Sequence, residues 1–484
     1  MSNELFIPDY IEVTPPTGYL NTDSHIHISG AKNEVLGVMS AAVLTDQPIV
    51  LENVPHISDV LSMGNIMLDL GVKVEYSPDT RQMFLHAKEI KSNSLSDEAF
   101  KFRASYYLWG ALLARFAITK EFDSLNIKTP GGCSFGGKRA INYHVDLMHN
   151  IFDARVSDKT GKIEIKLPKK CPVFDKRPIY STRQVSHGAT FHWMLSAATS
   201  RRDKFIYNAS LEPEVSHLLG ILNDMGANLR GTDHTAITSF GTGKLLAGGN
   251  FSILPDRMET ASYALLALAL KDDIVLEGVD MASCRPWMNS VREIVKSDRI
   301  EMLDTCPVYH TDKIKFMFQG VEIPHRTFQM SPFPGKETDL QQIWAPVLAR
   351  AKGTSKLIDP IWPGRFGHLS EMEKFGINAG YRHLDIKNSV APKALRVSVR
   401  PSHLLPANAV GMDLRGTFAL IMCACMTSGY ALGMWSKDCI SRIDKPEFAL
   451  RGYPDLVKNL RKIGIGVTES ESGRVVPPLP QLTR

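Results

Sequence analysis

Long apolar runs are absent from this sequence of 484 residues, and that absence removes one large class of protein. A helix that crosses a bilayer needs about 18 consecutive apolar residues, and the longest apolar run, around 418–426, falls well short. The first 19 residues contain acids and prolines and lack the apolar core of a signal peptide. We therefore expect a cytoplasmic protein that does not bind a membrane.

Cysteine is scarce, and a large surplus of one charge is missing. The 7 cysteines include no Cys-x-x-Cys pair, which fits a reducing compartment better than a disulfide-bonded secreted protein. The 56 basic and 51 acidic residues give a formal net charge of +5, without the basic block typical of nucleic-acid-binding proteins. We expect no nucleic-acid partner, whereas a slight surplus of cations suits a small acidic substrate.

What the sequence does contain is a degenerate repeat with a period of roughly 70 to 90 residues. Each unit begins with an Ala-rich helix that has polar or small residues at its start. A second helix follows, and in four units it ends at a glycine that needs positive φ: Gly71, Gly226, Gly376 and Gly464. Because the chain is too long for one core, six units divide most simply into three and three. The pattern predicts an α/β protein of two domains, each with three βαβαββ units.

A glycine-rich loop from Thr129 to Arg139 carries a single cysteine. Cys133 lies between two pairs of glycines, with Lys138 and Arg139 just behind it. Cations near a thiol lower its pKa, and cations beside exposed backbone N–H groups bind phosphate. The loop is typical of a lid that carries an acid or a nucleophile to a phosphorylated substrate. The alternative is a surface turn around a small buried cysteine.

Nine short motifs follow one another in a fixed order. They are Ser29–Asn33, Arg103–Ser105, Pro130–Cys133, Val185–Thr190, Leu254–Thr260, Thr338–Gln341, Gly364–Phe366, Asp413–Arg415 and Arg451–Tyr453. Together they resemble the enolpyruvyl transferases, and within that family the enzymes that act on UDP-N-acetylglucosamine in peptidoglycan synthesis.

The resemblance implies a fold, the inside-out α/β barrel. One domain would comprise residues 33–254 and carry the Cys133 loop, and the other would comprise residues 1–32 and 255–484. The chain would cross between them near Lys32 and near Pro255. The active site would lie in the cleft, which closes over the ligands.

The resemblance also implies a reaction. The enolpyruvyl group of phosphoenolpyruvate is transferred to a hydroxyl of a uridine nucleotide, with UDP-N-acetylglucosamine the first expectation. Phosphate leaves after an addition and an elimination. Neither a metal nor an organic cofactor takes part. Our expectation is therefore an enzyme whose partners are phosphoenolpyruvate and a nucleotide acceptor; the oligomeric state stays open.

Residue roles follow from the positions that match the family's motifs. Cys133 matches the acid that protonates phosphoenolpyruvate, and Asp339 matches the base that takes the proton of the acceptor hydroxyl. Asp339 also reads as an ordinary helix N-cap. The expected ligands of phosphoenolpyruvate are Lys32, Arg139, Arg365, Arg415 and Arg451, since cations must hold both its phosphate and its carboxylate. The expected acceptor-binding residues are Asn33, Arg103, Ser186, His187, Gly188 and Trp362.

The acceptor side departs from the family's pattern. Lys138-Arg139-Ala140 replaces the Arg-Pro behind the loop cysteine, so Lys138 rivals Arg139 as the loop cation. Gln184 replaces a lysine that meets the diphosphate, and His187 replaces a small residue. Arg183 and His187 are possible substitutes for the lost cation, because charge-assisted hydrogen bonds are the strong ones.

These departures leave other functions open. One is an enolpyruvyl transferase for the 3′-hydroxyl of UMP, as in nucleoside-antibiotic pathways, because a monophosphate acceptor would not need the missing lysine. Another, of a different class, is a paralogue that binds ligands without catalysis. The related enzymes that act on shikimate phosphate do not use a loop cysteine, so the stretch Pro130–Cys133 argues against them.

Overall fold

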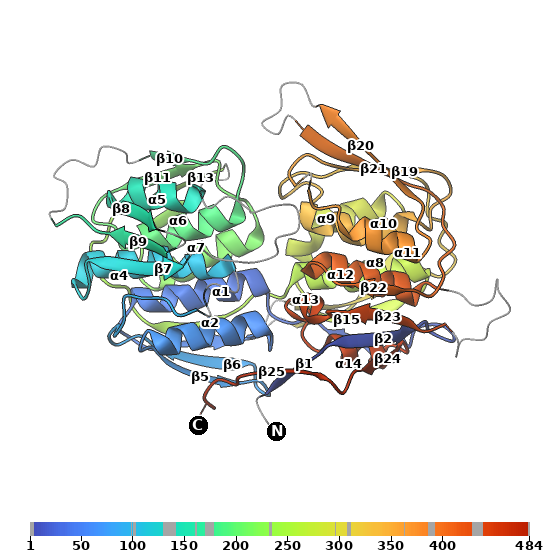
Figure 1. Ribbon diagram of the computed structural model, residues 1–484, viewed down its shortest axis with the longest axis horizontal. Helices are drawn as coiled ribbons and strands as arrows, with labels where there is room; N and C mark the ends of the chain where they lie inside the picture. The colour runs from blue at the N-terminus through green and yellow to red at the C-terminus, as the bar shows by residue number, and fades with distance from the viewer. Residues whose placement is uncertain are drawn as a thin grey trace.

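The computed structural model describes residues 4–97, 99, 103–128, 142–159, 162–169, 179–231, 235–295, 297–306, 311–362, 364–385, 393–427 and 439–482. Figure 1 shows two halves side by side, one with helices α1 to α7 and the other with α8 to α14, and both chain termini at the base. No helix in the described part of the chain is long and apolar enough to cross a membrane.

The elements up to the second crossing between the halves are, in order, β1 (Leu5–Pro8), β2 (Tyr10–Thr14), β3 (Ile26–His27), α1 (Lys32–Ala41), η1 (Ala42–Leu44), β4 (Ile49–Glu52), α2 (Ser58–Asp69), β5 (Lys73–Ser77), β6 (Gln82–His86), η2 (Arg103–Ser105), α4 (Tyr106–Thr119), β7 (Ser124–Lys128), α5 (Asn142–Phe152), β8 (Arg155–Lys159), β9 (Lys162–Lys166), β10 (Ile179–Ser181), α6 (His187–Ala197), β11 (Lys204–Tyr207), α7 (Pro213–Asp224), β12 (Leu229–Gly231), β13 (Ala236–Ser239) and β14 (Gly249–Ser252).

The elements beyond it are α8 (Arg257–Leu270), β15 (Ile274–Val279), α9 (Met281–Arg292), η3 (Ser297–Arg299), β16 (Ile300–Cys306), β17 (Thr311–Phe316), β18 (Thr327–Gln329), η4 (Thr338–Leu340), α10 (Gln341–Leu348), β19 (Ser355–Asp359), α11 (His368–Lys374), β20 (Ala379–Asp385), β21 (Lys393–Val399), β22 (Asn408–Val410), α12 (Leu414–Cys425), β23 (Ser441–Asp444), α13 (Glu447–Leu450), α14 (Leu456–Lys462), β24 (Gly466–Glu469) and β25 (Gly473–Val476).

The sheets repeat one pattern. Apart from the β1–β25 pair, the described strands form five sheets of four strands and one of three. In each four-stranded sheet one outer strand runs parallel to its neighbour and the other pairs are antiparallel, as in β14-β4-β6-β5. The three-stranded sheet, β7-β9-β8, is antiparallel throughout. The predicted α/β class is confirmed, while the inside-out barrel of two domains with three βαβαββ units each stays a prediction.

Three sheets are completed by strands from distant parts of the sequence. β14 joins the sheet of β4, and β3 joins the sheet of β15. β2, near the start of the chain, lies between β23 and β24, near its end. Each half therefore contains sheets that long-range strand pairing completes, and the chain must cross between the halves to supply these strands.

Local signals explain where the helices begin and end. Asp256 caps α8 by accepting from the backbone N–H groups of Met258 and Glu259 at 2.8 and 3.0 Å. The four glycines predicted to end helices have φ between 90 and 96°. That conformation is open to glycine at little cost, so these four predicted caps are confirmed.

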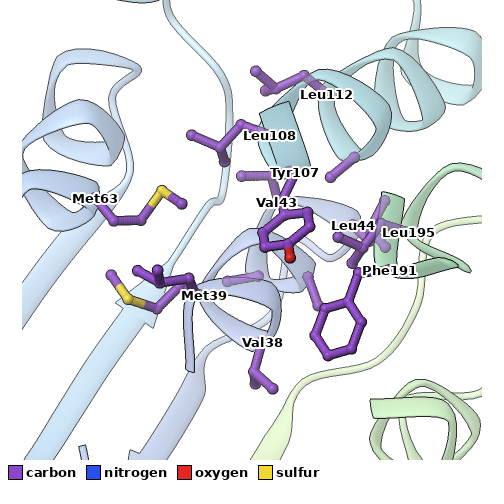
Figure 2. Packing of buried hydrophobic residues seen from close by; sticks show 14 of the residues in the cluster. Val38, Met39, Val43, Leu44, Met63, Tyr107, Leu108, Leu112, Phe191 and Leu195 are labelled. Carbon is purple, nitrogen blue, oxygen red and sulfur yellow. The ribbon is translucent and has the colours of Figure 1, made fainter. Parts of the chain in front are cut away.

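Two hydrophobic clusters form the cores. The first is built mainly from residues 31–253 and the second mainly from residues 11–28 and 258–467. Figure 2 shows Val38 and Met39 of α1 and Val43 of η1 near Tyr107 of α4 and Phe191 of α6 in the first cluster. The clusters support the expected domain boundaries, which stay a prediction.

A terminal ribbon departs from the expected division. β1 pairs with β25, and Figure 1 shows both strands running along the base between the halves. Ile7, Val476 and Leu479 pack into the first cluster, although residues 1–32 and 255–484 were assigned to the second domain. The physical reason is that these apolar side chains complete the core beside α2 and β5. Pro480 O accepts from Tyr76 N at 2.8 Å.

The crossing segments touch each other midway between the two cores. Gly30 and Pro255 form an antiparallel bridge. Ala31 N donates to Leu254 O, and Asp256 N donates to Ser29 O, both at 2.7 Å. The two segments therefore run past each other as a short, hydrogen-bonded pair just before the first residues of α1 and α8.

Candidate active site

A buried carboxylate joins two of the predicted phosphoenolpyruvate ligands. Lys32 begins α1, and its Nζ lies 2.7 Å from Asp59 Oδ2 on α2. Arg451, directly after α13, donates through Nε to Asp59 Oδ1 at 2.8 Å and through Nη2 to Oδ2 at 3.2 Å. Lys32 and Asp59 belong to the first half and Arg451 to the second. This cluster therefore spans the boundary between the cores.

The electrostatics of this cluster favour an anion. Burial would raise the pKa of Asp59, but Lys32 and Arg451 together lower it to about 2. Burial lowers the pKa of Lys32, with further lowering by Arg451 and Arg415 that Asp59 opposes. Two cations thus share one carboxylate while a third, Arg415, acts on Lys32, and an added phosphate would relieve their mutual repulsion.

A second ion pair brings the predicted base to another predicted phosphoenolpyruvate ligand. Arg365 Nη1 lies 2.5 Å from Asp339 Oδ1 in η4. Burial would lower the pKa of Arg365, but Asp339 and Asp413 raise it. The alternative N-cap role of Asp339 is wrong, because Glu337 precedes η4 and Leu340 precedes α10, and neither end has a side-chain cap. Thr338, the residue before Asp339, begins η4, and the Asp339 carboxylate faces Arg365.

A buried amide fixes the position of both arginines on this side. Gln342 Nε2 donates to Asp413 Oδ2 at 2.9 Å and to Arg365 O at 3.3 Å. Asp413 caps α12 by accepting from Gly416 N at 2.7 Å, so it also sets the start of the helix that carries Arg415. The backbone of Arg365 and the start of the helix that carries Arg415 are thereby tied to one amide.

Arg415 is the most buried of these cations. It is 5% exposed, and its Cζ lies 5.0 Å from the centre of the Tyr453 ring. Burial lowers the pKa of its guanidinium, but Tyr453, Asp256 and Asp339 raise it. Its Nη1 has no hydrogen-bond partner among the described residues. A buried donor of this kind marks a place where a ligand oxygen can bind.

Four of the predicted acceptor residues lie on three separate segments of the described chain. Ser186 is the N-cap of α6, and its Oγ accepts from Ala189 N at 3.3 Å. Gly188 allows close contact, because a Cβ there would lie 2.3 Å from Tyr106 Oη. Trp362 is 38% exposed, and its backbone N–H donates to Asp359 Oδ1 at 2.9 Å. Asn33 follows Lys32 on α1.

Three predicted site residues, and the rival loop cation, lie wholly or partly outside the described residues. Cys133 and Arg139, with the rival cation Lys138, lie outside the described residues. Arg103 begins η2, and its side chain is also outside them. Their roles stay predictions.

An acidic cluster that the sequence did not reveal adjoins the acceptor residues. His187 Nδ1 lies 2.7 Å from Glu212 Oε2. Arg257 donates to Glu214 at 3.0 Å and also pairs with Glu337, and its Nη2 lies 3.5 Å from Glu212. Three carboxylates therefore surround one arginine and one histidine.

The pKa shifts follow this crowding. Burial would lower the pKa of His187, but Glu212 and Glu214 raise it. Burial raises the pKa of Glu337 to about 7, against the effect of Arg257. The charge of Asp339 acts on Glu212, so the predicted base is near this cluster. His187 is thus engaged with a carboxylate and is a poor substitute for the missing phosphate-binding lysine.

Sequence patterns offered little signal for these residues. Asp59 is the second residue of α2, where acidic side chains are common because they interact favourably with the helix dipole. Glu214 occupies the same place in α7. Glu212 and Glu337 precede helical turns, which is equally ordinary. Only the packing of helices within the first half, and of the two halves on each other, shows that these carboxylates meet lysine, arginine and histidine.

The described residues contain no group of three or more His, Cys, Asp or Glu side chains that could hold a metal ion. Two cavities, of about 110 and 330 Å³, lie at the ends of α4 to α6 and beside the segment Pro15–Tyr19, and no predicted site residue lines either.

Comparisons with known proteins agree with this geometry. The profile of the family described as EPSP synthase (3-phosphoshikimate 1-carboxyvinyltransferase) matches residues 17–460. UDP-N-acetylglucosamine 1-carboxyvinyltransferase 2 of Lactococcus lactis subsp. lactis (strain IL1403) is 29% identical over 451 residues, which cover 91% of this chain and 95% of that protein. The enzyme of the same name from Staphylococcus aureus (strain Mu50 / ATCC 700699) is 29% identical over 465 residues, covering 94% and 98%.

Two solved structures share the fold. The enolpyruvyl transferase NikO from Streptomyces tendae superposes with a TM-score of 0.77 at 18% identity, over 96% of this chain and 99% of that one. EPSP synthase from Acinetobacter baumannii gives a TM-score of 0.63 at 14% identity, over 95% and 100%. The chain belongs to the EPSP synthase family, and it is an enolpyruvyl (carboxyvinyl) transferase. The predicted family and enzyme class are confirmed.

Proposed function

We propose that this enzyme transfers the enolpyruvyl group of phosphoenolpyruvate to a hydroxyl of UDP-N-acetylglucosamine and releases phosphate. The observation that carries the proposal is the set of four cations, Lys32, Arg365, Arg415 and Arg451, gathered around Asp59 and Asp339. One substrate with both a phosphate and a carboxylate matches such a set. Relatives named for transfer to UDP-N-acetylglucosamine support this acceptor.

In the proposed addition, each catalytic side chain transfers one proton. Cys133 gives a proton to the methylene carbon of phosphoenolpyruvate, which makes the adjacent carbon electrophilic. Asp339 takes the proton of the acceptor hydroxyl, whose oxygen then bonds to that carbon. In the elimination, the Cys133 thiolate takes a proton back from the new methyl group, and phosphate departs with the proton held by Asp339, which restores the double bond and both side chains. Lys32, Arg451 and Arg139 hold the phosphate, and Arg365 and Arg415 hold the carboxylate.

The proposal includes an architecture. We infer an inside-out α/β barrel with domains 33–254 and 1–32 plus 255–484, and an active site between them that closes on its ligands. The two core clusters and the cross-core ion pairs support it. The acceptor would contact Asn33, Arg103, Ser186, His187, Gly188 and Trp362. We place the reaction in the cytoplasm, where phosphoenolpyruvate is made.

The test measures phosphate released from phosphoenolpyruvate with UDP-N-acetylglucosamine and with UMP as separate acceptors. Release with the nucleotide sugar supports the proposal. The Asp339→Ala variant should bind phosphoenolpyruvate as well as the wild type, since Arg365 loses only its internal partner, and should lose turnover. Wild-type rates in that variant would remove Asp339 from the mechanism. No release with any acceptor would favour a non-catalytic paralogue.

A second acceptor is favoured by the contact between His187 and Glu212. That pair places a carboxylate where a further phosphate would be repelled, and Gln184 supplies no charge. UMP, with its single phosphate and a free 3′-hydroxyl, is the candidate. The Gln184→Lys variant separates the two acceptors: it should raise kcat/KM for UDP-N-acetylglucosamine several-fold and leave the value for UMP unchanged. Equal effects on both would count against a diphosphate at this position.

A further inference from the structure

Two fully buried glutamates lie beside the chain crossings and outside the cation cluster. Glu34 is the third residue of α1, and Glu259 is the third residue of α8. Both are 0% exposed. Each helix begins with a cation, Lys32 or Arg257, directly after the chain has crossed between the halves. The two glutamates therefore occupy equivalent places in the two halves.

Each glutamate binds the crossing segment that leads to the other helix. Glu259 Oε2 accepts from Ser29 N at 2.9 Å and from Ser29 Oγ at 2.6 Å. Ser29 lies three residues before Lys32. Glu34 Oε2 accepts from Leu254 N at 3.0 Å, and Leu254 lies three residues before Arg257. The contacts are reciprocal, although no local sequence pattern links residues more than 200 positions apart.

The space around the crossings leaves them little freedom. A Cβ on Gly30 would lie 1.9 Å from Asn53 O, so the first crossing lies in close contact with the backbone that follows β4. Asn53 Nδ2 donates to Ile253 O at 3.0 Å, which ties the second crossing to the same residue. Because interiors are close-packed, a small shift of either crossing must move its neighbours as well.

Both carboxyl groups can serve as acceptors at neutral pH. Burial raises the pKa of Glu259 to about 8, although its hydrogen bonds to Ser29 act in the other direction. Burial also raises the pKa of Glu34, and the contact between Glu34 Oε1 and His217 Nδ1 opposes that effect. A glutamine side chain has an oxygen acceptor of the same reach, so it can keep these bonds while an alanine cannot.

We propose that Glu34 and Glu259 are reciprocal positioning residues for the transfer reaction, each anchoring the crossing that leads to the first cation of the opposite helix. Glu259 holds Ser29 and thereby Lys32, which faces Asp59 and Arg451. Glu34 holds Leu254 and thereby Arg257, which faces Glu214 and Glu337. The pair sets the spacing between the cationic and acidic clusters. The inference rests on the proposed phosphate-binding role of Lys32.

The first test needs no activity. Hydrogen exchange is measured by mass spectrometry on peptides that cover 28–33 and 253–258 in the full-length protein, its Glu259→Ala, Glu259→Gln and Glu34→Ala variants, and a control. Leu265→Ala is the control, because Leu265 is fully buried on α8 but lies outside the crossings. Glu259→Ala and Glu34→Ala should each speed exchange about tenfold in both peptides, since the segments are bonded to each other. The exchange rates of both peptides in Glu259→Gln and Leu265→Ala should stay within about twofold of the wild-type rates.

The second test is kinetic and uses the same variants. Glu259→Ala should raise KM for phosphoenolpyruvate about tenfold with a smaller change in kcat, because a displaced Lys32 weakens binding of the donor phosphate. Glu259→Gln should restore KM. Leu265→Ala should lower the midpoint of thermal unfolding and leave KM unchanged.

The outcomes separate the inference from the proposed function. Faster exchange in both peptides, without phosphate release by the wild type, would support the anchoring and overturn the function. Normal phosphate release with unchanged exchange and KM in Glu259→Ala would overturn the positioning role. Faster exchange confined to the peptide bonded by the mutated residue would overturn the coupling between the two crossings and leave each anchor in place.

Discussion

At the scale of single residues, Asp59 is the counter-ion that two cations of the candidate site share. Its carboxylate is almost fully buried and lies between Lys32 of one half and Arg451 of the other. Without it, two cations would face each other with little screening. A buried charge that loses its partner is costly, so the carboxylate stabilises the site when no phosphate is bound.

The Asp59→Asn variant tests this. It should lower the free energy of unfolding by about 3 kcal/mol, because Lys32 and Arg451 lose their counter-charge. Phosphate or phosphoenolpyruvate should then raise the midpoint of thermal unfolding more in the variant than in the wild type, since the ligand supplies the missing charge. Equal ligand-induced shifts in the two proteins would show that the cations do not meet the phosphate. Asp69→Asn, at the exposed end of the same helix, is the control.

Glu259 makes the stability of the protein depend on pH. In the unfolded chain a glutamate loses its proton near its ordinary pKa of 4.5, whereas in the folded protein the pKa is about 8. Asp256 adds to this elevation and Arg81 opposes it. The folded state holds more protons between these values, so its stability falls as pH rises through that window.

The Glu259→Gln variant removes this titration. Relative to the wild type it should gain stability as pH rises, by more than about 1 kcal/mol between about pH 5 and pH 9. Urea unfolding at a series of pH values measures the difference. A constant difference across the series would mean that Glu259 is ionised in the folded protein throughout.

At the scale of elements, the crossing segments depend on a residue without a side chain. Gly30 lies against Asn53 O so closely that no Cβ fits. The contact is with backbone, which cannot rotate away as a flexible side chain can. The start of α1, and with it Lys32 and Asn33, therefore depends on one glycine.

A matched pair of glycine substitutions tests the crossing. Gly30→Ala should lower the free energy of unfolding by about 3 kcal/mol or more through overpacking. Gly220→Ala, in the middle of α7 where no atom lies within 4 Å of the added carbon, should stabilise by about 0.5–1 kcal/mol. Urea unfolding of both variants gives the comparison. An unchanged free energy of unfolding in Gly30→Ala would mean that the crossing segments can shift to admit the added carbon.

At the scale of the whole molecule, the two halves are joined in more places than the two central crossings. The β1–β25 ribbon reaches from the second half to the first, where Ile7, Val476 and Leu479 enter the first core. Leu479 packs on Gly64, whose missing side chain makes room for it. The ribbon limits how far the halves can separate while both cores stay intact.

Two neighbouring valines on β25 test the ribbon. Val476→Ala should lower the free energy of unfolding by about 2 kcal/mol, because its side chain is 7% exposed in the first core. Val475→Ala, 53% exposed on the opposite face, should change it by less than about 0.5 kcal/mol. Equal effects in denaturant unfolding would show that the ribbon does not dock on the first core.

The amino-acid sequence by itself determined the local structure and the residue types of the site. Gly71 and Gly464 end helices because glycine adopts positive φ cheaply, and Asp256 starts α8 because its carboxylate caps free N–H groups. Lys32, Arg365 and Arg451 could be singled out because anion binding demands cations in recognisable motifs.

Only the tertiary structure decided which distant residues meet. Asp59 and Glu212 look like ordinary acids beside helix starts until the helices of the first half pack together and bring Lys32 and His187 to them. The insertion of β2 between β23 and β24 has no local signature, because any strand of alternating pattern could fill that place. Charge pairing and strand pairing act across space, and their partners are selected by the packing of the whole chain.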